Sequence, residues 1–210
     1  MTIRHHPSAA TLGAYVSGAL DAGRRLVVAS HLERCPHCRR LTSDLEEVGG
    51  ALLETVAPAT MGPDALENVL ARLDLTGAER PIPPDIRGEG TLPAAVRHYP
   101  LGRWRRVSRG IEMRPILLPK PHPVRVFLLR GQPGTTLLQH SHRGEEFTTV
   151  LTGAYAHAGG TFGPGDFEEA DETVEHRPVV TEDGACICLV ALEGLRFGGL
   201  IGTLLNPVLG

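Results

Sequence analysis

Two clusters of metal-ligating residues, one in each half of the 210-residue chain, constrain its fold more than any other feature. The first cluster is His31-x-x-x-Cys35-x-x-Cys38. The second is Gly134-x5-His140-x-His142-x3-Glu146-x6-Gly153, followed downstream by His176. The first is typical of a structural zinc site in a helical segment, and the second of the metal site of a small β-barrel. A chain built this way is more plausibly a metal-dependent switch than a simple enzyme.

The first 75 residues are predicted to form about four helices. Ser8 is a candidate N-cap for the first helix, whose apolar residues recur at helical spacing as far as Leu20. A second helix follows Asp21 and must end before Pro36, because proline disfavours helical geometry in the residue before it. Pro36 is itself suited to begin a third helix. A fourth is expected after Gly62-Pro63-Asp64, with an apolar face of Leu66, Val69, Leu70 and Leu73. That face either packs on its own domain or docks on a partner.

The N-terminal cluster supplies three of the four ligands that structural zinc requires. His31 and Cys35 lie one helical turn apart, and Cys38 falls in the first turn of the next helix, so the three can meet at one ion. The fourth ligand must come from elsewhere, and His6 or His5 is the natural candidate. The two cysteines also allow a redox dithiol. A zinc site of this kind contributes about 10–16 kcal/mol, which would dominate the stability of so small a helical unit.

The composition and the predicted secondary structure of the chain change after residue 75. Residues 76–93 have the composition of a linker, and 197–210 form a C-terminal extension. From about Trp104, short apolar runs separated by glycine, proline and aspartate turns predict a β-sandwich or closed barrel over 94–196. The residues expected to line this barrel include Phe147, Val150 and Leu151.

The second cluster, in the predicted barrel, has the residue types that bind a transition metal. His140 and His142 are two residues apart on a predicted strand, so their side chains face the same side. Glu146 follows across a bend at Arg143-Gly144. Imidazole and carboxylate together suit zinc or another divalent transition metal, and the spacing does not choose between a structural ion and one that supports oxygenase chemistry.

Two further observations bound the function. Cys186 and Cys188 share one face of an apolar strand, either as buried small hydrophobes or as oxidisable thiols near the barrel metal. The longest apolar run is far shorter than the about 18 residues of a membrane helix, and no segment resembles a signal peptide, which predicts a cytoplasmic protein without a membrane partner.

These motifs resemble the ChrR family of anti-sigma factors, in which a zinc-binding helical domain precedes a cupin domain. The opening Met1-Thr2-Ile3-Arg4-His5-His6 and the run Val27–Leu32 also look like that family, and the resemblance covers nearly all of the chain. It implies a domain division of 1–75, linker 76–93, cupin 94–196 and extension 197–210. It also implies that His6 is the fourth zinc ligand.

The second histidine motif departs from ordinary cupins. The turn Gly163-Pro164-Gly165-Asp166 is present, but His176 comes eleven residues after Gly165 where ordinary cupins have a histidine three after. The ChrR-like proteins share the longer spacing, so the resemblance implies that His176 is the fourth ligand of the cupin metal, with His157 as its rival.

The resemblance implies a cytoplasmic anti-sigma factor and not an enzyme. Its helical domain is expected to sequester an extracytoplasmic-function (ECF) sigma factor and to release it on oxidative stress, of the singlet-oxygen or organic-peroxide type, sensed by the cupin domain. Two alternatives stay open: a cupin metal-dependent dioxygenase or isomerase with a helical appendage, and a DNA-binding regulator with a cupin sensor. Residues 1–75 carry 7 basic and 9 acidic side chains, which favours protein over direct nucleic-acid contact.

Overall fold

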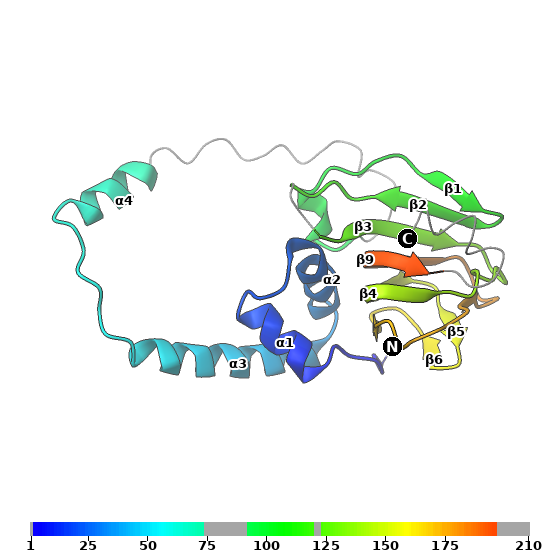
Figure 1. The fold of residues 1–210 in the computed structure, drawn as a ribbon, viewed down its shortest axis with the longest axis horizontal. Helices are drawn as coiled ribbons and strands as arrows, with labels where there is room; N and C mark the ends of the chain where they lie inside the picture. Colours follow the sequence, from blue (N-terminus) through cyan, green and yellow to red (C-terminus); the bar gives the residue numbers. More distant parts are fainter. Residues whose placement is uncertain (1, 74–91, 120–122, 197–210) are drawn as a thin grey trace.

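The computed structural model describes residues 2–73, 92–119 and 123–196, in which a set of N-terminal helices lies against a β-sandwich (Figure 1). Most of the predicted linker and all of the C-terminal extension lie outside the described residues. The helices are α1 (Ala9–Val16), α2 (Ala22–Leu32), α3 (Pro36–Glu54) and α4 (Ala65–Leu73), and a 3-10 turn, η2 (Val96–His98), precedes the sheet.

Local capping sets where the helices begin, as the sequence predicts. The Ser8 hydroxyl accepts the Thr11 amide hydrogen at the start of α1, and the Asp21 carboxylate caps α2 in the same way. Pro36 occupies the first turn of α3. The prediction is wrong at the end of α1, which stops at Val16 because Gly18 adopts a left-handed φ of 76°.

The β region forms two antiparallel sheets, which confirms the predicted sandwich. The larger sheet has the strand order β1-β2-β3-β9-β4-β7, and the smaller has the order β6-β5-β8. The strands are β1 (Arg105–Ser108), β2 (Ile111–Pro115), β3 (Arg125–Gly131), β4 (Ser141–Thr152), β5 (Tyr155–His157), β6 (Gly160–Phe162), β7 (Phe167–Ala170), β8 (Val179–Val180) and β9 (Cys186–Arg196). The bend expected at Arg143-Gly144 is a bulge inside β4, where the register with β9 shifts and Gly144 has a φ of 77°.

Strand β4 divides its side chains between two hydrophobic cores. Val150 belongs to the core between the two sheets, whereas Phe147 and Leu151 belong to the core that the large sheet shares with the helices. The expectation that all three line the barrel is therefore wrong for Phe147 and Leu151. Successive residues of a strand point to opposite faces, so odd and even positions of this strand separate.

Helix α2 packs directly on the large sheet. A Cβ atom at Gly23 would lie 2.3 Å from a methyl group of Val124, so only glycine permits this approach. The Thr149 hydroxyl donates to the Val27 carbonyl at 3.1 Å, and Arg34 donates to the Leu151 carbonyl at 2.7 Å. The helical part and the sandwich are thus in contact through buried and polar groups, which the sequence alone did not predict.

The second half of α3 and all of α4 extend away from the sandwich, and we call residues 48–73 the α3–α4 arm (Figure 1). The only buried residues of α3 are Cys38 and Thr42, both near its start, and α4 has none. Within the part of the chain that the structure describes, no helix has the length and apolar character needed to cross a membrane.

Candidate metal centres

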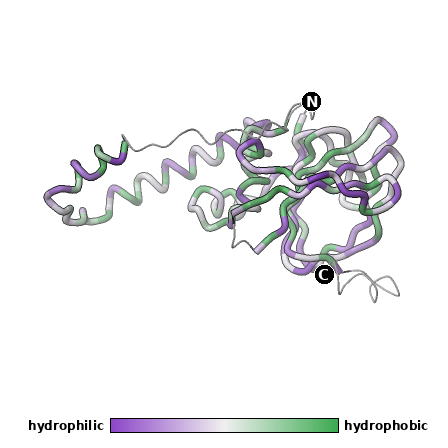
Figure 2. The backbone as a smooth tube through the Cα atoms, turned by 90° about the horizontal axis from the view of Figure 1, so that it is seen from above, coloured by the Kyte–Doolittle hydropathy of each residue, from purple (hydrophilic) through white to green (hydrophobic). Residues whose placement is uncertain are grey.

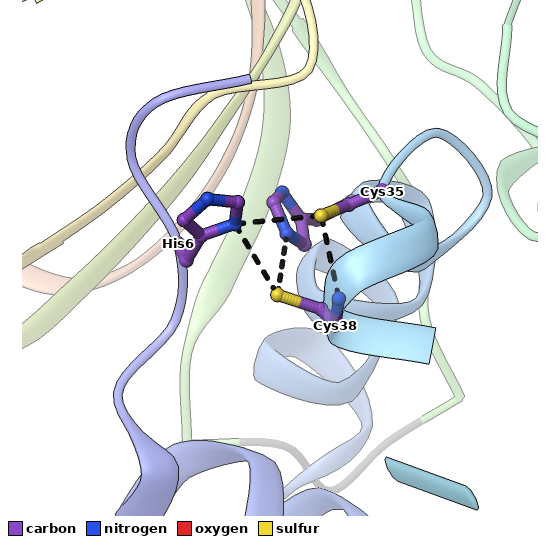
Figure 3. A group of neighbouring side chains, drawn as sticks. His6, Cys35 and Cys38 are labelled. Carbon is purple, nitrogen blue, oxygen red and sulfur yellow. Dashed lines mark hydrogen bonds between the residues drawn. The ribbon is translucent and has the colours of Figure 1, made fainter. Parts of the chain in front are cut away.

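Four predicted ligands meet where α2 ends and α3 begins. The cluster comprises His6, His31, Cys35 and Cys38. His6 Nδ1 lies 3.4 Å from the sulfur atoms of both Cys35 and Cys38, and His31 Nε2 lies 3.3 Å from Cys38 Sγ. Figure 3 shows His6 on the N-terminal segment facing the two cysteines. His5 points elsewhere and stacks on Phe162, with ring centroids 4.2 Å apart.

These distances match a tetrahedral zinc ion. With Zn–S near 2.3 Å and Zn–N near 2.0 Å, a tetrahedron has N···S edges of roughly 3.5 Å. The four ligand atoms, which all lie within 4.8 Å of one another, therefore have the separations that such an ion requires. Zinc bound here by His6, His31, Cys35 and Cys38 would join the N-terminal segment, α2 and α3.

Burial sets the protonation of this centre. Burial lowers the pKa of His31 to about 4, so its imidazole is neutral and able to donate a lone pair near pH 7. Burial, together with the neighbouring Cys35, raises the pKa of Cys38 to about 12. A metal ion must therefore displace the Cys38 proton when it binds, because the thiolate is the ligand form.

The second cluster lies at the edge of the sandwich interior. His140, His142 and His176 bring their ring nitrogens within 4.8 Å of one another, and the Nε2 atoms of His140 and His176 are 3.0 Å apart. Glu146 Oε2 lies 3.4 Å from His142 Nε2, a nitrogen that is buried and makes no hydrogen bond with the described residues. A buried, unsatisfied nitrogen facing two other imidazoles is what a metal ion would satisfy.

Each of the three imidazoles has its Nδ1 engaged by an oxygen. His140 donates to the Leu138 carbonyl at 2.7 Å, and His142 donates to the Asp171 carbonyl at 3.1 Å. The Nδ1 of His176 lies 3.2 Å from Glu168 Oε1. Such partners fix the tautomer and ring orientation of metal-ligating histidines and direct the Nε2 atoms at one point.

Glu168 is the site residue that sequence reasoning missed. Burial disfavours its charge, but hydrogen bonds from His176 and Tyr155 outweigh burial and hold the pKa of Glu168 below its usual value. His157, the predicted rival of His176, lies 2.9 Å from the same carboxylate and contacts His176, and His157, Glu168 and His176 also have the separations of metal ligands. The signal was available, because Glu168 stands three residues after Gly165, where ordinary cupins have a histidine.

A cavity of about 650 Å³ opens onto this cluster. Its walls are mainly aliphatic, and His140, Glu146, His176 and Glu168 lie among its lining residues. Cys186 and Cys188 also line it, and their sulfur atoms are 3.6 Å apart. The hydrogen bond with Cys186, together with burial, raises the pKa of Cys188, so this thiol stays protonated and behaves as a small apolar group in the resting protein.

Comparisons with known proteins agree with this architecture. Residues 9–39 match a putative zinc-finger family model, and residues 95–196 match the ChrR cupin-like domain. The chain is 39% identical to the anti-sigma-E factor ChrR of Cereibacter sphaeroides, over 99% of this chain and 98% of that protein. It also resembles the crystal structure of Rhodobacter sphaeroides SigE in complex with the anti-sigma ChrR, with a TM-score of 0.75, 36% identity and coverage of 91% of this chain and 99% of that one.

The fold and the two centres define a two-domain regulator in which a zinc-finger helical domain is joined to a cupin-like barrel. The identity to an anti-sigma factor over nearly the whole chain goes further than this class. The chain belongs to the ChrR family of anti-sigma factors, which confirms the family that the sequence motifs indicated.

We expect the purified chain to carry two metal ions and His142→Ala to carry one. Removing His142 takes away a buried nitrogen at the centre of the second cluster, whereas the Cys35/Cys38 centre is untouched. Elemental analysis by mass spectrometry measures the stoichiometry. His98→Ala, an exposed histidine before the sheet, is the matched control and should keep both ions. Two full equivalents in His142→Ala would contradict this assignment.

Proposed function

We propose that this protein is an anti-sigma factor that sequesters an ECF sigma factor and releases it under oxidative stress. In this proposal the helical domain, residues 1–75, binds the sigma factor, and the cupin domain, residues 94–196, is the sensor. The proposal includes no direct contact with nucleic acid or a membrane. The observation that carries it is the α3–α4 arm.

The α3–α4 arm exposes a row of large apolar side chains. Each is more than half exposed, and together they are Val48, Leu52, Leu53, Val56, Met61, Leu66, Val69, Leu70 and Leu73. Figure 2 shows that these hydrophobic segments lie on a projection that extends away from the sandwich. Monomeric proteins rarely leave so long an apolar surface in water, and an amphipathic helix with such spacing typically enters a hydrophobic groove of a partner.

The sigma factor is the partner that the relatives support. The structure most informative here is a complex of SigE with the anti-sigma ChrR, whose chain is 36% identical to this one. By inference, the apolar arm of this chain binds an apolar surface of its own sigma factor. In this proposal zinc at His6, His31, Cys35 and Cys38 fixes the first turn of α3, from which the arm projects.

The cupin centre is proposed as the sensor. Its ligands would be His140, His142, Glu146 and His176, holding zinc or another divalent transition metal. The aliphatic cavity beside them can admit a small oxidant or an apolar peroxide, and the buried pair Cys186 and Cys188 is part of its lining. Singlet oxygen and organic peroxides are the proposed stimuli.

Complex formation tests the proposal directly. Mixed in turn with each ECF sigma factor encoded in the same genome, the purified chain should form a 1:1 complex with one of them on size-exclusion chromatography. It should also block binding of that sigma factor to core RNA polymerase. A housekeeping sigma factor is the control and should remain unbound. Failure of every ECF sigma factor to co-elute at about 10 µM would refute the function.

A further inference from the structure

One turn of the cupin domain holds an imidazole of the zinc centre. His31 is fully buried, and its Nδ1 donates a hydrogen bond of 2.8 Å to the carbonyl oxygen of Gly165. The Phe167 ring, two residues further along, meets the His31 ring edge-on with centroids 5.6 Å apart. Because Nδ1 is engaged, Nε2 is the nitrogen that faces Cys38.

The same turn holds the segment that carries the second imidazole. Asp166 Oδ1 accepts the backbone hydrogens of Arg4 at 2.7 Å and of His5 at 3.0 Å. The Phe167 amide in turn donates to the His5 carbonyl at 3.1 Å. His6 is the next residue, so the N-terminal segment is paired to the start of β7 immediately before it reaches the cysteines. The zinc centre is therefore built from both domains, with its cysteines at the N-cap and first turn of α3 and its imidazoles held by the cupin turn.

Strand β7 also reaches the cupin centre. Glu168, two residues after Asp166, lies with Oε1 3.2 Å from His176 Nδ1, and its other carboxylate oxygen accepts the Tyr155 hydroxyl. The short segment 165–168 thus contacts ligands of both clusters: Gly165 contacts His31 through its carbonyl, and Glu168 contacts His176 through its carboxylate. Sub-ångström shifts of such a packed strand cannot be absorbed locally, because protein interiors are close-packed.

We propose that the turn 163–166 and β7 form a coupling element between the two metal centres. Asp166 is the positioning residue on the zinc side, and Glu168 is the positioning residue on the cupin side. Loss of the cupin metal frees His176, relaxes Glu168 and β7, and loosens the hold of the turn on the zinc imidazoles. The proposal deepens the proposed function, on whose metal centres it rests, by naming the route from sensor to sigma-binding domain.

A double-mutant cycle on the full chain tests this coupling. Cobalt(II) replaces zinc in the Cys35/Cys38 centre, where its thiolate absorption reports that centre alone, and its loss to excess EDTA is timed. His142→Ala, which disables the cupin centre, should speed cobalt loss about 5- to 30-fold, a usual size for coupling between sites. Asp166→Ala should speed it about 10- to 100-fold, as for other supports of metal ligands. In the Asp166→Ala background, His142→Ala should change the rate of cobalt loss less than twofold, because the link between the two centres is already broken.

Two control variants separate positioning from general damage. Asp166→Asn keeps an oxygen for the Arg4 and His5 hydrogens and loses only the acceptor of the Gly163 amide hydrogen, so it should keep the His142→Ala effect. Asp183→Ala removes an exposed carboxylate and should change nothing. If Asp166→Ala does not fold, Glu168→Gln takes its place in the cycle under the same criteria. An equal His142→Ala effect with and without the second substitution overturns the proposal, as does no effect in the parent. The cobalt measurement involves no sigma factor, so its failure is distinct from failure of sigma binding.

Discussion

Cys38→Ser is expected to release α1, α3 and the α3–α4 arm while the sandwich stays folded. A structural zinc ion contributes about 10–16 kcal/mol, as much as the whole stability of a typical small domain. Apart from Cys38, α3 buries only Thr42, and Leu41 and Leu45 are half-buried against the core. Helix α2 should remain in place, because Leu26, Val27 and Val28 are buried and each contributes about 1.5–3 kcal/mol.

Circular dichroism at 222 nm and hydrogen exchange of each helix measure this result. The helical signal should fall by more than half, with fast exchange in α1 and α3 and slow exchange in β3, β4 and β9. Cys186→Ser is the matched control, since it alters a buried cysteine of β9 and leaves the zinc ligands intact. A Cys38→Ser protein that keeps its helices and still captures the sigma factor would show that zinc does not shape the binding domain.

The helices and the ligand clusters were predictable because both are determined by residues close together in the sequence. Ser8, Asp21 and Pro36 determine helix starts through their own side chains or ring, whatever the rest of the chain does. Likewise, the spacing between His31 and Cys38 reflects what one zinc ion can span. Choosing His6 over His5 as the zinc ligand required the family resemblance, because two adjacent histidines are equivalent candidates when only the sequence is known.

The joint between the two domains was not predictable, since it depends on residues far apart in the sequence. Gly23 reads in the sequence as an ordinary helical glycine, but in the structure Val124, just before β3, and Val126 of β3 lie directly against it. In the sequence Asp166 is a turn residue, but its carboxylate accepts backbone hydrogens from Arg4 and His5, which are 162 and 161 residues away. The sequence places all four predicted zinc ligands in residues 1–75, whereas in the structure the cupin turn also contacts His31 and the segment that carries His6.

Leu70→Asp on α4 is expected to weaken sigma-factor binding more than 100-fold without changing the fold. Leu70 is 53% exposed in the free protein, so a carboxylate there stays hydrated and costs little. In the complex the same carboxylate would enter an apolar groove and lose its water. Such a substitution costs about 3 kcal/mol or more, and every 1.4 kcal/mol is tenfold in Kd. Titration calorimetry with the ECF sigma factor measures the change.

Asn68→Asp is the matched control, because it adds the same charge to the same helix on its polar face. It should leave Kd within about threefold, since an exposed charge at the rim of an interface contributes little. The contrast between the two variants decides which role α4 has. If Leu70→Asp and Asn68→Asp bind alike, the apolar face of α4 is not the contact surface. If only Leu70→Asp loses sigma-factor binding, the exposed apolar side chains of the α3–α4 arm form the contact surface. Their exposure in the free chain is then explained, because the sigma factor covers them in the complex.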